Sequence, residues 1–113
     1  MKPDRDELRL QLVIESIEKI TLWISGQTST SFSKEKNEIL FDAVLMKLIF
    51  IGELCSKTTA ETQNNNPKIP WRQLKDLRNV IAHEYLGVDS TQIFVMATSE
   101  LPKLISILKE SIS

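Results

Sequence analysis

Apolar residues recur at steps of three and four along the first part of the chain. Within residues 4–25 this spacing holds for Leu10, Val13, Ile14, Ile17, Ile20 and Ile24. Because such a period gathers apolar side chains on one face, it predicts an amphipathic helix over residues 4–25. Residues 26–33 are rich in Ser and Thr, whose side chains compete for the hydrogen bonds of a helix, and they predict a loop.

The stretch 34–59 predicts a second helix with two apolar stripes rather than one. The first stripe consists of Leu40, Val44, Leu48, Ile51 and Cys55, and the second of Ile39, Ala43, Met46, Phe50 and Leu54. One stripe can face the core of the same chain, and the other needs separate cover. Two explanations stay open at this point: a partner subunit covers it, or the helix is central and packed on both sides within its own bundle.

The second half of the chain predicts two further helices. Residues 61–70 are polar and read as a connector, after which residues 71–86 predict a third helix that stops at Gly87. Asp89 resembles the N-cap of a fourth helix, and Pro102 inside that helix should kink it or split it into two. We therefore expect an all-α fold, an up-and-down bundle of four to five helices in a single domain over residues 1–113.

Composition adds limits to this picture. Lys and Arg total 14 against 15 Asp and Glu, so the whole chain lacks the basic balance of a protein that grips nucleic acid by charge alone. Cys55 is the only cysteine, which excludes an internal disulfide and leaves no cysteine cluster for zinc. We expect no cofactor, no metal site and no membrane span. Because nothing at the N-terminus resembles a signal peptide, we expect a cytoplasmic protein.

Candidate chemistry is concentrated in residues 71–87, which contain the only histidine and the only tyrosine of the chain. Between residues 67 and 87, four cationic side chains stand against two anionic ones, so this part is locally basic. On a helical wheel, Arg78 and Tyr85 line one flank of the apolar face, while Asn79 and His83 point away from its centre. Histidine moves protons near neutral pH, and arginine binds phosphate with a planar fork.

Each of these residues also has a purely structural interpretation. His83 can be an inert surface residue, Arg78 can form an ion pair with Asp76 or with a neighbouring helix, and Tyr85 can be a rim residue with its ring on the core. Metal-free RNA cleavage needs a base, an acid and a cation near phosphorus, and one chain offers one histidine. A two-fold homodimer supplies two copies of His83 and Arg78 to one cleft.

The segment Arg78-Asn79-Val80-Ile81-Ala82-His83-Glu84-Tyr85 reproduces the Arg, four residues, His, one residue, Tyr motif of HepT-like toxins. These toxins are a HEPN family found beside minimal nucleotidyltransferase antitoxins. The resemblance extends in order through Ile51-Gly52-Glu53, Ile69-Pro70-Trp71-Arg72 and Tyr85-Leu86-Gly87-Val88-Asp89, and so covers nearly the whole chain.

The resemblance implies a homodimeric HEPN bundle with metal-independent endoribonuclease activity on RNA. It implies that Arg78 and His83 are catalytic, that Asn79 supports them, and that a partner nucleotidyltransferase transfers AMP from ATP onto Tyr85. Two other functions remain open: a non-catalytic substrate- or nucleotide-binding subunit of a nucleotidyltransferase complex, and a purely structural dimeric bundle.

Overall fold

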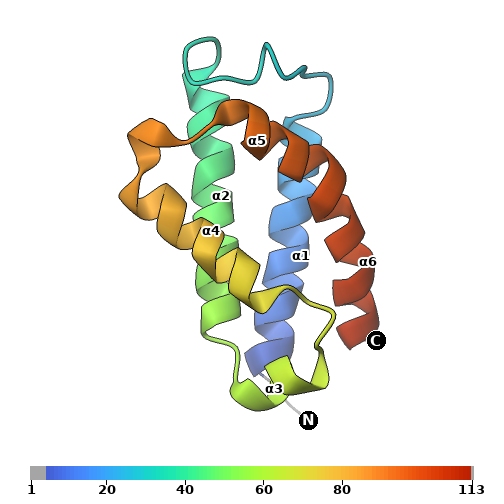
Figure 1. The fold of residues 1–113 in the computed structure, drawn as a ribbon. Helices are drawn as coiled ribbons and strands as arrows, with labels where there is room; N and C mark the ends of the chain where they lie inside the picture. Colours follow the sequence, from blue (N-terminus) through green and yellow to red (C-terminus); the bar gives the residue numbers. More distant parts are fainter. Residues whose placement is uncertain (1–4, 113) are drawn as a thin grey trace.

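Two long antiparallel helices form the centre of the fold. In the computed structural model, which describes residues 5–112, α1 spans Arg5–Trp23 and α2 spans Glu38–Ser56. The two helices lie side by side and run in opposite directions (Figure 1). Their facing sides bury the residues of the predicted apolar stripes, among them Leu10, Val13, Ile17, Ile20, Val44, Leu48 and Ile51. Both predicted helices are confirmed, although Asp4 at the predicted start lies outside the described residues.

The second helix begins four residues later than predicted. Residues 34–36 form a turn instead, in which the Ser33 hydroxyl accepts a hydrogen bond from the Lys36 N–H at 3.0 Å. Asn37 then caps α2 by accepting from the Leu40 N–H at 3.2 Å. Local side-chain hydrogen bonds of this kind replace helical ones. The loop is fixed by Phe32, whose ring is fully buried between those of Phe41 and Phe94.

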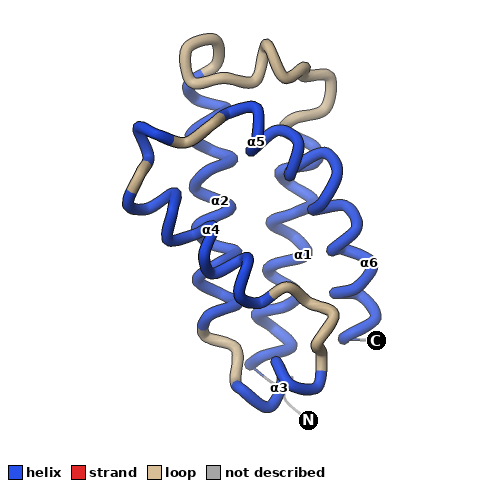
Figure 2. The backbone as a smooth tube through the Cα atoms, viewed as in Figure 1, coloured by secondary structure: helices blue, strands red, loops and turns tan. Residues whose placement is uncertain are grey.

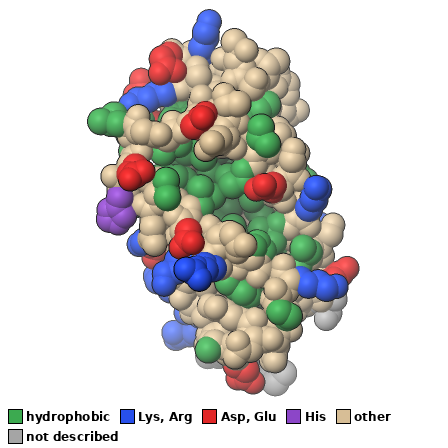
Figure 3. Space-filling model, in the orientation of Figure 1, with side chains coloured by type: hydrophobic (Ala, Val, Ile, Leu, Met, Phe, Trp, Pro, Cys, Tyr) green, Lys and Arg blue, Asp and Glu red, His purple; other side chains and the backbone are tan. Residues whose placement is uncertain are grey.

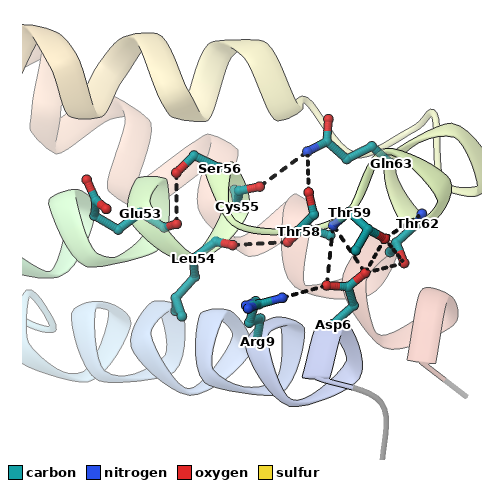
Figure 4. A network of polar contacts seen from close by, with 10 residues as sticks. All are labelled: Asp6, Arg9, Glu53, Leu54, Cys55, Ser56, Thr58, Thr59, Thr62 and Gln63. Carbon is teal, nitrogen blue, oxygen red and sulfur yellow. Dashed lines mark hydrogen bonds and ion pairs between the residues drawn. The ribbon is translucent and has the colours of Figure 1, made fainter.

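A short helix, α3 at Ala60–Asn65, lies where the sequence predicted only a connector. It has no buried residue, so it lacks the apolar period by which helices are recognised. Its start is held by Thr59 and Thr62, whose hydroxyls donate to the Asp6 carboxylate of α1 at 2.5 and 2.6 Å (Figure 4). Burial alone raises the pKa of Asp6, but the hydrogen bonds from Thr59, Thr62 and Arg9 outweigh it and leave the pKa lowered.

The third predicted helix is α4, which spans Trp71–His83 and crosses α2 diagonally (Figure 1). Its start is confirmed, but it ends three residues before Leu86. Glu84 leaves the helical conformation, and residues Tyr85–Gly87 form a separate 3-10 turn, η1. Tyr85 is therefore not on the helix. The prediction that Arg78 and Tyr85 line the same flank of one helix is wrong.

The C-terminal part follows the predicted pattern. Asp89 caps α5, Ser90–Val95, by accepting from the N–H groups of Thr91 and Gln92 at 2.9 and 3.4 Å. A π-helical segment, η2 at Met96–Glu100, then leads into α6, Leu101–Ile112. Pro102 lies in the first turn of α6, where its missing N–H is tolerated, and the wide turns of η2 precede it. The sequence predicted a kink or a split at this proline, and the chain stays helical across Val95, Met96 and Leu101 with a π-helical distortion just before Pro102.

The helices pack around one hydrophobic core. Figure 2 shows the arrangement of the helices as a backbone tube. Helix α6 packs beside α1, and α4 packs across α2. Over residues 5–112 the structure contains no strand, which confirms the all-α bundle. None of the helices in this range combines the length and apolar character needed to cross a membrane.

Candidate functional site

The crossing of α4 over α2 positions Arg78. Its guanidinium forms an ion pair with Glu53 of α2 through Nη2, and Nη1 donates to the Asn79 Oδ1 at 2.6 Å. The third nitrogen, Nε, is buried without a hydrogen-bond partner. Both side chains of the ion pair are about one-third exposed, at 35% and 34%. The structural alternative of an ion pair with a neighbouring helix is therefore realised for Arg78, with Glu53 as its partner.

This crossing depends on Gly52. A Cβ atom added to Gly52 would lie 2.3 Å from the Arg78 Cβ and 3.0 Å from the Leu74 carbonyl oxygen. Real Cβ atoms do not approach so closely, so only glycine allows the two backbones this separation. Gly52 thus determines the distance between α4 and α2, and Glu53 beside it is the ion-pair partner of Arg78. Sequence reasoning noted these two residues as part of a resemblance but gave them no role.

His83 is placed quite differently. It is the last residue of α4 and is exposed, and within residues 5–112 its imidazole makes no hydrogen bond or ion pair. In Figure 3 the histidine, in purple, stands at the edge of the molecule. Because α4 is continuous from Arg78 to His83, five residues keep the two side chains about 140° apart around the helix. One chain therefore does not bring this arginine and this histidine together.

Tyr85 turns back onto α2. Its hydroxyl donates to the Asp42 carboxylate, its ring lies 6.4 Å from that of Phe41, and the Lys34 ammonium lies 4.4 Å from its ring centroid. The hydrogen bond to Asp42, with burial and the charges of Asp42 and Glu38, raises the pKa of Tyr85 to about 12. A phenol held this way is a hydrogen-bond donor and stays protonated at neutral pH. The ring rests against the core, as the rim interpretation predicted.

Two acidic residues of α2 thus hold the two ends of the motif, Glu53 at Arg78 and Asp42 at Tyr85. Sequence reasoning did not single out Asp42 or Lys34. The only available signal was their place on predicted exposed positions, which many charged residues share.

Among the described residues, no three His, Cys, Asp or Glu side chains gather in a way that could hold a metal ion.

The all-α bundle and the spacing of Arg78, His83 and Tyr85 are the two features to compare with known protein families. Residues 13–111 match the model of the family described as "Ribonuclease HepT-like". The chain belongs to this family, which supports a ribonuclease function in general terms. The expected family is confirmed.

Individual relatives agree with the family match. A Caldanaerobacter subterraneus subsp. tengcongensis protein named "Putative RNase" is 27% identical over 101 residues, 89% of this chain and 88% of that protein. A Thermococcus cleftensis "Probable ribonuclease HepT" is 31% identical over 62 residues, 55% of this chain and 56% of its own length.

A "Gamma-glutamylcyclotransferase and putative RNase" of Methanocaldococcus jannaschii is 29% identical over 98 residues, 87% of this chain. The chain spans only 43% of that protein and thus less than two thirds of two of these three relatives. No solved structure matches the chain.

Proposed function

We propose that the chain is the toxin of a HEPN and minimal nucleotidyltransferase toxin–antitoxin pair. In this proposal it is a homodimeric, metal-independent endoribonuclease, and AMP transfer onto Tyr85 by the partner antitoxin neutralises it. Arg78 and His83 are its catalytic residues and Asn79 supports Arg78. The observation that carries the proposal is the anchored Arg78 guanidinium on the same helix as an exposed His83, in a chain of the ribonuclease HepT-like family.

The chemistry follows from the groups present. The 2′-hydroxyl of a ribose attacks the adjacent phosphorus, and the bond to the 5′-oxygen of the next nucleotide breaks, which leaves a cyclic phosphate. An imidazole takes the proton of the attacking hydroxyl, and another returns a proton to the leaving oxygen. The guanidinium of Arg78 stabilises the extra negative charge on phosphorus. Two imidazoles are needed if both proton transfers use histidine, which favours a dimer.

A second observation supports the dimer. On α2 the side chains of Ile39, Met46 and Phe50 are 85%, 64% and 38% exposed, although they belong to the second apolar stripe. At 100° per residue, these three lie within about 80° of the line from Asp42 to Glu53, which contacts the motif. A second copy seated on this stripe would lie beside Arg78 and Tyr85 and would bring its own His83 nearby. The separation of Arg78 and His83 within one chain would then not prevent a shared cleft.

Neutralisation has a physical reason at Tyr85. An AMP group on its oxygen replaces the proton that now bonds Asp42 and adds a negative phosphate beside that carboxylate. Like charges repel, so the modified side chain leaves its place on α2. It then carries bulk and negative charge into the region where an RNA phosphate must approach Arg78.

The test is cleavage of RNA by the purified chain in the presence of EDTA. We expect cleavage, and we expect His83→Ala to reduce its rate by about 100-fold or more. Because His83 is exposed, the unfolding free energy of that variant should change by less than about 0.5 kcal/mol. Lys103→Ala, at an exposed position of α6, is the control and should cut at the normal rate. Cleavage that requires a metal ion, or that survives in His83→Ala, would overturn the proposal.

One observation favours the binding-subunit alternative: Glu53 already occupies the guanidinium of Arg78. In that case the wild-type chain would cut no RNA, while nucleotidyl transfer by a partner enzyme would depend on it. Co-expression with a candidate nucleotidyltransferase, followed by the mass of the peptide that contains Tyr85, separates the two functions.

A further inference from the structure

A cavity with several polar and charged lining residues adjoins the motif beside α4. It has a volume of about 550 Å³ and lies between α4, the end of α2 and α3, with Gln63, Trp71, Arg72, Lys75 and Asn79 among its lining residues. We propose that this cavity is an RNA subsite, which binds a nucleotide next to the phosphodiester that is cut. This inference rests on the proposed ribonuclease function.

Asn79 links the cavity to the site. Asn79 is one of the lining residues, and its Oδ1 accepts the hydrogen bond from Arg78 Nη1 at 2.6 Å. A phosphate bound near Arg78 would therefore lie at one end of the cavity, and the neighbouring nucleotide of the same strand would lie inside it. Asn79 is thus the residue that joins the lining of the cavity to Arg78, where cleavage is proposed.

The cationic residues of the cavity share a flank of α4 with His83. Arg72, Lys75, Asn79 and His83 follow one another at steps of three and four, and at 100° per residue they fall within a sector of about 80°. Arg72, Lys75 and His83 are exposed. In Figure 3, blue Lys and Arg side chains gather below the histidine over α4. An RNA strand that follows this flank would contact the positive charges of Arg72 and Lys75 before it reaches His83.

Among the described residues that line the cavity, Asp76 is the acidic one, and it does not cancel this charge. The Arg72 Nε lies 3.8 Å from the Asp76 carboxylate, and the two side chains are 91% and 62% exposed. Ion pairs this open are weak, typically about 0–1 kcal/mol, so a phosphate can compete for Arg72. Lys75 has no ion pair among the described residues. Two cations against one anion leave the cavity net positive.

Trp71 and Gln63 give the cavity a fixed wall. The Trp71 indole N–H donates to the Asn66 carbonyl at 3.1 Å, and the Gln63 amide N–H donates to the Thr58 carbonyl at 3.0 Å. Both side chains are half-buried, so these bonds hold their orientation. A fixed indole and a fixed amide are groups against which an unpaired base can stack or hydrogen-bond. Single-stranded RNA is therefore the ligand class that the lining favours.

The groove on the opposite side of α4 is unsuitable for binding RNA. This groove of about 410 Å³ is lined mainly by apolar side chains, including Leu74, Leu77, Met96 and Leu104, and its charged lining residue is Glu100. Such a surface offers no cation for a phosphate. The contrast between the two sides of one helix assigns the RNA to the side of Arg72 and Lys75.

The inference is tested by RNA binding in a chain that does not cut. A fluorescent single-stranded RNA of about ten nucleotides is titrated onto His83→Ala, and its anisotropy is followed at several salt concentrations. Adding Arg72→Ala and Lys75→Ala should weaken binding by about 10-fold or more. It should also reduce the slope of log affinity against log salt by about 0.7 for each lost phosphate contact. Lys36→Ala with Lys103→Ala removes the same charge from exposed positions elsewhere and should leave affinity nearly unchanged.

Kinetics give a second measurement on the active chain. Lys75→Ala should raise KM for RNA several-fold with kcat nearly unchanged, because the subsite contacts a part of the RNA that does not react. If the wild type cuts RNA but both pairs of variants bind it equally well, the subsite is wrong and the proposed function stands. If the wild type neither cuts nor binds RNA, both the subsite and the proposed function are wrong.

Discussion

Arg78 and His83 lie on one helix, yet the fold treats them in opposite ways. Arg78 lies where α4 approaches α2 closely over Gly52, with an acidic partner and an amide partner. His83 is at the free end of α4, exposed and without a polar partner among the described residues. The chain alone thus fixes the proposed phosphate-binding group and leaves the proposed proton-transfer group unfixed. Such a division is expected if a second copy or the RNA completes the site.

Substitution of Gly52 is expected to have the largest effect, because it displaces the helix that carries Arg78. In Gly52→Ala the new Cβ would lie 2.3 Å from the Arg78 Cβ, so α4 must move away from α2. We expect a loss of about 1–3 kcal/mol in the free energy of unfolding, measured by urea denaturation. RNA cleavage measured on the folded fraction should also fall, because the guanidinium moves with α4.

Gly87→Ala is the matched control, since a Cβ at that position would meet nothing within 4 Å beyond its own chain neighbours. It should change the unfolding free energy by less than about 0.5 kcal/mol. Equal stability of the two variants would mean that the crossing does not depend on Gly52.

The sequence predicted the elements that carry a local signal. The apolar period located α1 and most of α2, Pro70 and Trp71 located the start of α4, and Asp89 located the start of α5. It missed α3, which has no buried face and depends on Asp6, a residue more than fifty positions earlier. A contact that joins distant segments leaves no period in either of them.

The same reason explains what was missed at the candidate site. The spacing of Arg78, His83 and Tyr85 is visible in the sequence, and it suggested the family that the comparison confirmed. The partners Glu53 and Asp42 are not visible, because they depend on how α4 crosses α2. The early end of α4 was not visible either: Glu84 leaves the helical conformation, and the Tyr85 hydroxyl that follows it bonds Asp42, 43 positions away.

Removal of the ion pair between Arg78 and Glu53 is expected to have an intermediate effect on the rate of RNA cleavage. Glu53→Gln removes the charge that holds Nη2, so the guanidinium is less well positioned and kcat for RNA should fall several-fold. Because both side chains are about one-third exposed, the free energy of unfolding should change by no more than about 1 kcal/mol. Glu18→Gln, which removes the exposed pair with Lys109, should change neither quantity. If kcat rises instead, Glu53 competes with RNA for Arg78 and does not position it.

The smallest effect is expected at Tyr85, and it can be followed without any RNA. The pKa of Tyr85 is raised from 10.0 to about 12, mainly by the hydrogen bond to Asp42. Asp42→Asn should lower this pKa toward 10, as measured by the ultraviolet absorbance of the phenolate, to which the single tyrosine is the only contributor. In the wild type the folded state keeps the phenol proton that the unfolded state loses above pH 10.

The contribution of Tyr85 to stability is therefore complete below pH 10 and is lost as the pH rises from 10 to about 12. Unfolding of the wild type should become more favourable across this range, and Asp42→Asn should show a weaker dependence on pH there. Identical titrations of the two proteins would mean that Asp42 does not hold the phenol. The Tyr85 hydroxyl would then lack its partner, and the Tyr85 side chain would be held by the packing of its ring alone.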